Sequence, residues 1–464
     1  MISNHIDRRI FLHLAAAAPI VAGLAEIGLA GGTADISPGG VSPFPLEAVR
    51  LLPSPFLDAV NSNQRYLHKI EADRLLHNFR VHAGLKPKGE TYGGWEADTI
   101  AGHSTGHYLT ACSLMYGQTG DPESKKRADY IVSELAECQK AAGDGYVAAF
   151  TRRKDGKVED GRVVFDEIKR GEIRSAGFDL NGSWVPLYNW HKLFSGLFEA
   201  NTHCGSTRAL IVATALAGYI DGVFSKVNDD QLQKVLNCEH GGINESFAEL
   251  YSRTNDKRWL ALAERIRHHR TLDPMFARED KLPGLHANTQ IPKVIGLARL
   301  YELTGKPEYA TAANFFWDTV TAKYSYAIGG NSDREHFQAP NSLARYITDQ
   351  TCESCNTYNM LKLTRHLFAW DPRSSYFDYY ERAHFNHMLA QHDPSTGMFA
   401  YMVPLMSGSA RSYSTEFNDF WCCVGSAHRA RPASERASMG SKYTKWRPGL
   451  TLGAVHTDTP VVRS

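Results

Sequence analysis

The chain has 464 residues and an almost even charge balance, with 51 lysine and arginine residues against 50 aspartate and glutamate residues. This balance excludes the basic footprint expected of a nucleic-acid-binding protein, and the ordinary glycine and aromatic content is typical of a globular enzyme. The length allows two or three domains, or one large helical toroid.

The first 32 residues stand apart from the rest of the chain. The pair Arg8-Arg9 precedes an apolar, alanine-rich run over residues 14–30. This pattern predicts a twin-arginine export signal over residues 1–32, and so a periplasmic or secreted protein; an ordinary secretory signal or a membrane anchor is the alternative. No other apolar run approaches the ~20 residues that span a bilayer, so we expect no membrane association after signal removal.

A helix-junction pattern recurs at residues 115–121, 250–256 and 300–306, and looser copies occur at 197–205 and 367–372. Each full copy places Gly or Asn between two helical stretches, where these residues accept the left-handed conformation that ends a helix. Apolar residues recur at helical spacing on both sides. The repeat predicts stacked helix pairs, in either an open solenoid or a closed all-α toroid.

Histidines recur in phase with this repeat. They fall at or near the start of each predicted inner helix: His103, His107, His191, His240 and His286. Taken singly, each histidine is more often a core or capping residue than a ligand. A toroid, however, gathers the same end of every inner helix around one pocket, so the phase favours a closed ring.

Aromatic residues near the histidines supply flat faces on which sugar rings can stack. They are Trp95, Trp184, Tyr188 and Trp190. Their alternative interpretation is that of ordinary core residues.

The strongest chemical pattern combines Glu353 and Cys355 with the adjacent pair Cys422 and Cys423. Adjacent cysteines rarely form a disulfide with each other. Three thiolates and one carboxylate make a tetrahedral set that suits Zn²⁺ rather than Mg²⁺ or Ca²⁺. The spacing matches no common zinc-finger module, so buried free thiols or exchangeable disulfides are the alternative. The sequence also leaves open whether four further cysteines pair or stay buried: Cys112, Cys138, Cys204 and Cys238.

Eight short stretches form a set of motifs. They are residues 94–96, 102–108, 188–192, 239–242, 284–290, 329–337, 353–359 and 421–423. Together they resemble the β-L-arabinofuranosidases of glycoside hydrolase family 127 and the related family 146, over about residues 42–426. The combination of Glu-x-Cys with Cys-Cys makes this resemblance specific.

The resemblance implies an (α/α)6 barrel that carries a retaining glycosidase site for plant-derived, arabinose-containing glycans or glycoproteins. It implies that Cys422 is the nucleophile and that Glu335 is the general acid/base. The implied zinc ligands are Glu353, Cys355, Cys422 and Cys423, and the positions matching sugar contacts are His191, His240, His286 and Tyr401. To these we add Trp95 as a stacking residue. Chemically, bound Zn²⁺ keeps a thiol as its thiolate, and the neighbours Arg334 and His336 would lower the pKa of Glu335 if they pointed inward.

The resemblance stops after Ser426. Family members continue into a further barrel helix and β-sandwich domains, whereas residues 427–464 are basic, rich in small residues and without periodicity. We therefore expect a barrel over residues 42–426 that is open on one side, a disordered tail, as after a frameshift or truncation, and no β-sandwich. Two alternative functions follow: a glycosidase for another sugar, and a noncatalytic remnant that zinc merely staples.

Overall fold

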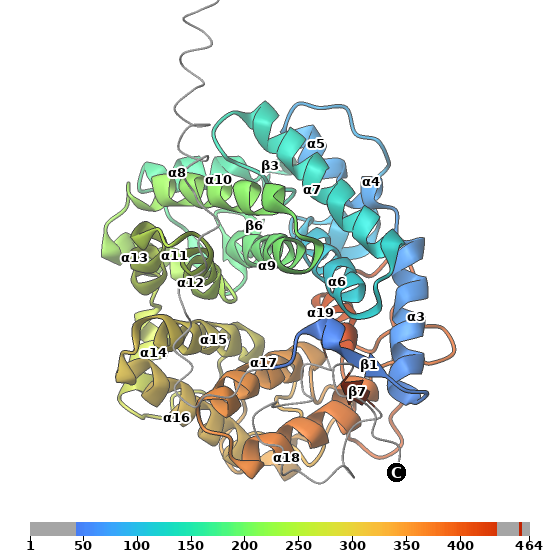
Figure 1. Cartoon of the computed structure of the whole chain (residues 1–464). Helices are drawn as coiled ribbons and strands as arrows, with labels where there is room; N and C mark the ends of the chain where they lie inside the picture. Colours follow the sequence, from blue (N-terminus) through green and yellow to red (C-terminus); the bar gives the residue numbers. More distant parts are fainter. Residues whose placement is uncertain (1–42, 434–453, 457–464) are drawn as a thin grey trace, which may run out of the picture.

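The computed structural model describes residues 43–433 and 454–456, so the expected export signal and most of the expected tail lie outside it. Within the described residues, six helices stand side by side in an inner ring and six more surround them (Figure 1). The inner helices are α6 (His103–Thr119), α9 (Pro186–Cys204), α12 (Ile243–Thr254), α15 (Ala287–Thr304), α17 (Ser354–Trp370) and α19 (Cys422–Ala433). The outer helices are α3 (Pro55–Lys69), α7 (Pro122–Ala142), α10 (Thr207–Phe224), α13 (Lys257–Arg265), α16 (Pro307–Lys323) and α18 (Ser374–Ala383). This arrangement is an (α/α)6 toroid, as predicted.

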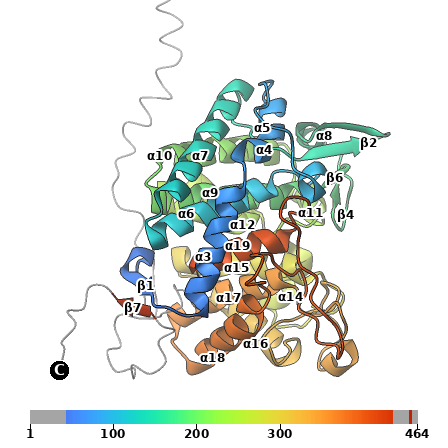
Figure 2. The same cartoon turned by 90° about the vertical axis from the view of Figure 1, so that its right-hand side faces the viewer.

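Helix α19 closes the ring, because it packs against both α17 and α6. Its outer neighbour is α3, which comes from the opposite end of the described chain (Figure 2). The expectation of an open barrel, with helical structure ending at residue 426, is therefore wrong: α19 runs on to Ala433. The helix is buried on every side through Ala430, so its sequence lacks the amphipathic period by which a surface helix is recognised.

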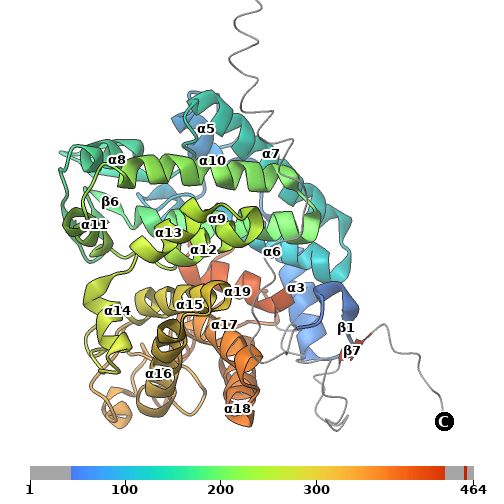
Figure 3. The same cartoon turned by 60° about the vertical axis from the view of Figure 1, so that its left-hand side comes forward.

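The junctions between inner and outer helices follow the predicted repeat. Gly120, Gly205, Asn255 and Gly305 end α6, α9, α12 and α15 with φ angles of 73°, 68°, 55° and 70°. Such left-handed residues turn the chain back along the helix it has just left. Figure 3 shows the resulting pairs, with α10 beside α9 and α16 beside α15.

Backbones approach most closely between α6 and α9. A Cβ atom at Gly106 would lie 2.3 Å from the Lys192 carbonyl carbon, and one at Gly196 would lie 2.7 Å from the Gly106 carbonyl oxygen. Only glycine fits at these two positions. A Cβ at Gly425 of α19 would likewise lie 2.3 Å from His107 Cγ. Glycines thus allow close packing of the three inner helices α6, α9 and α19.

Shorter elements connect and cover the rings. The short helices are α4 (Ala72–Leu75), α5 (His77–His82), α8 (Arg162–Lys169), α11 (Asp229–Leu236) and α14 (His269–Phe276), with single turns η1 (Leu46–Ala48), η2 (Gly94–Ala97), η3 (Leu343–Tyr346) and the π-helical η4 (His384–Leu389). Strands β2 (Thr151–Lys154) and β3 (Lys157–Asp160) form a hairpin, and β4 (Ser175–Ala176), β5 (Asp179–Leu180) and β6 (Ser183–Trp184) form a small antiparallel sheet. Strand β1 (Val49–Leu51) pairs antiparallel with β7 (Ala454–His456), Val49 opposite His456.

One outer helix corrects the expectation that no apolar run besides the signal approaches membrane-spanning length. Among the described residues, α10 has 18 residues and a mean hydropathy of 1.3, which is enough to cross a bilayer by length and composition alone. Half of this helix is buried within the protein, where it packs against the inner helix α9 and the neighbouring outer helix α7. Its apolar face is thus used within the protein.

Candidate active site

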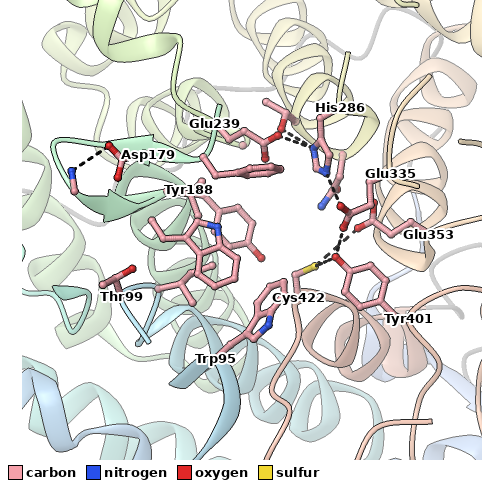
Figure 4. Close-up of a pocket in the computed structure, with 18 of the residues that line it drawn as sticks. Trp95, Thr99, Asp179, Tyr188, Glu239, His286, Glu335, Glu353, Tyr401 and Cys422 are labelled. Carbon is pink, nitrogen blue, oxygen red and sulfur yellow. Dashed lines mark hydrogen bonds and ion pairs between the residues drawn. The ribbon is translucent and has the colours of Figure 1, made fainter. Parts of the chain in front are cut away.

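A cavity of about 610 Å³ opens at the end of the ring where inner helices begin. Three of these helices, α15, α17 and α19, present a residue from their first turn or N-cap: His286, Glu353 and Cys422 (Figure 4). Trp95 of η2 and Tyr188 of α9 form the wall opposite His286. The toroid thus gathers helix starts that are far apart in sequence around one cavity.

A buried cluster of four side chains lies at the floor of the cavity: Glu353, Cys355, Cys422 and Cys423. Their potential ligand atoms all lie within 4.8 Å of one another. Cys423 Sγ lies 3.4 Å from Cys355 Sγ and 3.9 Å from Cys422 Sγ. Glu353 Oε1 lies 3.7 Å from Cys423 Sγ and 3.9 Å from Cys422 Sγ. Sulfurs bonded to tetrahedral zinc at about 2.3 Å stand about 3.7 Å apart, so these spacings fit a zinc ion.

Two further observations agree with a metal. The second carboxylate oxygen of Glu353, Oε2, is buried without a hydrogen-bond partner among the described residues, an arrangement that is costly unless a cation compensates it. Burial raises the pKa of Cys355, but hydrogen bonds from Cys422 and Cys423 outweigh it and bring the pKa down to about 6. The cluster therefore already favours a thiolate.

Cys422 is placed differently from its two neighbours. Of the three cluster thiols, only Cys422 lines the cavity; it is 6 % exposed, against 1 % for Cys355 and 0 % for Cys423. Its Sγ lies 3.8 Å from the Tyr401 hydroxyl. Cys422 is thus the sulfur that a molecule in the cavity can meet, while the others are left to hold a metal.

Glu335 faces the same cavity from the loop that precedes α17 (Figure 4). The Tyr401 hydroxyl donates a hydrogen bond to Glu335 Oε1, and His286 Nε2 lies 3.7 Å from Glu335 Oε2. On its other side, His286 Nδ1 lies 2.7 Å from Glu239 Oε1. A carboxylate, an imidazole and a second carboxylate therefore stand in a row along the cavity wall.

Burial raises the pKa of Glu335, but its interactions with His286 and Tyr401 outweigh burial and lower it overall. Of the two neighbours considered from the sequence, His336 lowers this pKa, whereas the Arg334 side chain turns outward and pairs with Asp333, 2.7 Å away. Glu335 itself adopts a φ of 66° and Arg334 a φ of 47°, both in the left-handed region that costs free energy for residues other than glycine. This backbone aims one neighbour into the cavity and the other at solvent.

The proposed sugar contacts divide into two groups. Trp95, His286 and Tyr401 line the cavity. His191 and His240 do not: both are buried, His191 Nδ1 accepting a hydrogen bond from the Gly242 amide at 3.0 Å and His240 Nδ1 lying 3.1 Å from the Cys238 carbonyl oxygen. They support the backbone behind the cavity wall, and the interpretation of these two as sugar contacts stays a prediction.

The other candidates follow the same division. Trp184 and Tyr188 line the cavity, whereas Trp190 is a core residue whose indole donates to the Val147 carbonyl. His103 and His107 are fully buried. The four cysteines left open by the sequence are free and buried: Cys112, Cys138, Cys204 and Cys238.

Several lining residues were missed from the sequence. Glu239 belongs to one of the motifs, next to His240, so a signal existed, although the residue named from that motif was His240. Four further lining residues come from segments outside the long helices, where no helical periodicity marks them. They are Thr99 just after η2, Arg153 in β2, Phe178 just before β5 and Asp179 at the start of β5. Their place in the site depends on how β2 and the β4–β6 sheet fold over the ring.

Comparison with known proteins gives the assignment. A family model described as the β-L-arabinofuranosidase GH127 catalytic domain matches residues 48–435. The chain belongs to the GH127 family. This match also extends past residue 426, to the end of α19.

Solved GH127 structures share the fold. A GH127 β-arabinofuranosidase superposes with a TM-score of 0.64 at 19 % identity, covering 86 % of this chain and 62 % of the other. A GH127 β-L-arabinofuranosidase from Geobacillus stearothermophilus T6 gives 0.62 at 18 % identity, covering 83 % and 65 %. The chain thus spans less than two thirds of the length of these relatives. A search of curated protein sequences gave no significant match.

Proposed function

We propose that this GH127 protein is a zinc-dependent retaining glycoside hydrolase that releases β-linked L-arabinofuranose from plant-derived glycans or glycoproteins. The observation that carries the proposal is the position of Cys422, which belongs to a buried Cys3Glu cluster and also reaches the cavity that Glu335 faces. The family match supports the sugar.

In the first step, the Cys422 sulfur attacks the anomeric carbon, a C–S bond forms and the glycosidic C–O bond breaks. Glu335, whose carboxylate is ionised in the free site, takes a proton from the adjacent His286 and passes it to the departing oxygen. In the second step, the Glu335 carboxylate takes a proton from water, the water oxygen attacks the anomeric carbon, and the C–S bond breaks to restore the thiolate. Two inversions at one carbon retain its configuration.

The neighbouring side chains prepare these steps. The Tyr401 hydroxyl donates to Glu335 and lies beside Cys422, so it sets the distance between acid and nucleophile. His286, between Glu239 and Glu335, stores a proton next to the general acid, because Glu239 and Glu335 raise its pKa well above normal despite burial. A zinc ion bound by the cluster would hold Cys422 as a thiolate at neutral pH.

The decisive experiment compares the zinc-loaded chain with its Cys422→Ser variant on a chromogenic β-L-arabinofuranoside, with zinc content measured on both. We expect turnover by the parent and a loss of at least 10³-fold in the variant, since the nucleophile has been removed. A variant as active as the parent would contradict the thiolate mechanism. A zinc-loaded parent that is inactive on arabinofuranosides but active on another glycoside would change the sugar, and inactivity on all would indicate the noncatalytic remnant.

We also propose that residues 1–32 direct export by the twin-arginine route to the periplasm or beyond. The support is the Arg8-Arg9 pair ahead of an apolar run. This route carries folded proteins, so the thiol cluster would receive its metal in the reducing cytoplasm before it meets an oxidising compartment.

A further inference from the structure

Beneath the thiol cluster, the interior of the ring carries an unusual concentration of positive charge. Lys192 lies four residues after Tyr188 on α9, Lys362 seven residues after Cys355 on α17, and Arg429 seven residues after Cys422 on α19. Intervals of four and seven return to the same face of a helix. Each of these three inner helices thus places a site residue at its start and a cation one or two turns below it.

Two of these cations are buried without a carboxylate partner. Lys192 and Arg429 are each 3 % exposed, and neither forms an ion pair with any described residue. Lys192 Nζ lies 5.0 Å from the centre of the Tyr188 ring. Arg429 donates to Ser195 Oγ at 2.7 Å, while its Nε is buried with no hydrogen-bond partner. An isolated buried cation is strongly destabilising unless a nearby negative charge compensates it.

The local carboxylate is already engaged. Glu245 of α12 forms an ion pair with Lys362 and lies 3.5 Å from His191 Nε2. With Lys192 protonated, these three cations and one carboxylate carry a net charge of about two positive units. Burial and, to a lesser extent, Arg429 lower the pKa of Lys192 to about 7, whereas the charge of Cys355 raises it, so a negative charge on the cluster favours the protonated form of Lys192.

The thiol cluster can supply the negative charge that compensates these cations. Three thiolates and one carboxylate around a divalent ion carry a net charge of about two negative units. The ring of Tyr188 packs against the cluster of Cys355, Cys422 and Cys423, and Lys192 Nζ lies 5.0 Å from the centre of the same ring. The cysteines and Lys192 are all buried. In such a low-dielectric interior, charges interact strongly over several ångströms.

We propose that Lys192 and Arg429 are positioning residues that act through the thiol cluster: they form a cationic floor that balances the net negative metal–thiolate centre and so raises its affinity for zinc. The proposal rests on the metal site of the proposed function, though not on its glycosidase activity. It also accounts for cations in an interior where apolar residues would pack at lower cost.

The test measures zinc affinity of the full chain by competition with a chromophoric chelator at pH 7. We expect Lys192→Met to weaken zinc binding about 10- to 100-fold, the usual effect of losing a residue that supports metal ligands, and Lys192→Arg to stay within a few-fold of the parent. The chain provides a matched control in Lys293, a second buried lysine, which donates to Gln290 Oε1 at 2.9 Å and lies 3.0 Å from His268 Nδ1. Lys293→Met should leave zinc affinity unchanged.

A second readout separates this role from a merely structural one. Because an uncompensated cation destabilises the metal-free chain, Lys192→Met should not lower the thermal midpoint of the metal-free protein, yet it should shrink the increase that zinc produces. If Lys192→Met fails to fold, the Arg429→Met variant tests the same cationic floor. Titration of this variant with Co²⁺ then measures metal binding, because thiolate coordination of Co²⁺ is seen by absorbance. The proposal is overturned if both methionine variants bind zinc as tightly as the parent, or if the parent binds no zinc. A parent that binds zinc but has no glycosidase activity leaves the proposal standing.

Discussion

At the scale of single residues, the site depends on which side chains the backbone aims into the cavity. Glu335 and Arg334 are neighbours with positive φ angles, and one faces the cavity while the other meets solvent. Cys422 and Cys423 are likewise neighbours at the start of α19, and only the first reaches the cavity. Adjacent residues thus take different roles because their side chains leave the backbone in different directions.

The proposed role of Glu335 as general acid predicts that the loss of activity in a Glu335 variant depends on the leaving group of the substrate. In Glu335→Gln, we expect kcat/KM for an arabinose disaccharide to fall about 10²- to 10⁴-fold, because its alkoxide needs a proton to depart. An activated nitrophenyl arabinoside, whose phenolate leaves without a proton, should lose much less in the first step. Steady-state kinetics on both substrates measure this, with unchanged zinc content as the control. Equal losses on both substrates would show that Glu335 is not the acid.

At the scale of elements, buried polar groups join one inner helix to the next. Glu302 of α15 lies within 2.6 Å of His366 Nδ1 on α17, accepts a hydrogen bond from the Trp370 indole at 3.0 Å, and pairs with Arg299 at 3.0 Å. Burial raises the pKa of Glu302, but His366 and Arg299 outweigh it and bring it down to about 2. The helix contact is therefore stabilised by the ionised form.

The Glu302–His366 pair predicts a contribution to the free energy of unfolding that depends on pH. Since the folded pKa lies below the unfolded value of about 4.3, the contribution is fully present above that pH and is lost as pH falls towards 2. Glu302→Gln should cost about 3 kcal/mol at pH 7, and the difference from the parent should narrow below pH 4. Urea unfolding at pH 7, 5 and 3 measures it. Glu264→Gln, in a half-exposed pair with Lys306, is the control and should change stability by less than about 1 kcal/mol; a Glu302 effect independent of pH would contradict the argument.

At the scale of the whole molecule, closure of the ring joins residues from both ends of the described chain. Helix α3, near its start, covers α19, near its end, and the residues of the Cys3Glu cluster come from α19 and from the N-terminal end of α17. The packing of α19 against α17 and α6 brings this cluster together. A route that exports the chain already folded would keep the cluster assembled.

The proposed twin-arginine signal predicts how export would fail. Replacing Arg8-Arg9 with Lys-Lys should leave the protein in the cytoplasm of a host with a working twin-arginine translocase, because the pair is the recognised feature of the signal. Cell fractionation and immunoblotting measure the distribution, and the same chain in a host without the translocase is the control. Export of the Lys-Lys variant, or export in the deficient host, would exclude this route.

Local patterns in the chain were enough to predict the helix pairs, the Cys3Glu cluster and the importance of Glu335, since each depends on a short signal: left-handed Gly or Asn at helix ends, thiols beside a carboxylate, and short motifs. Three other points depend on how the chain folds in three dimensions. α19 lacks a period because it is buried on all sides, so its continuation and the closure of the ring escaped detection. His191 and His240 keep the phase of the repeat yet lie behind the wall, because phase places a residue along a helix and not around it. Lys192 and Arg429 come from α9 and α19, which are distant in sequence, and the burial that strengthens the effect of their charges is a property of the folded ring alone.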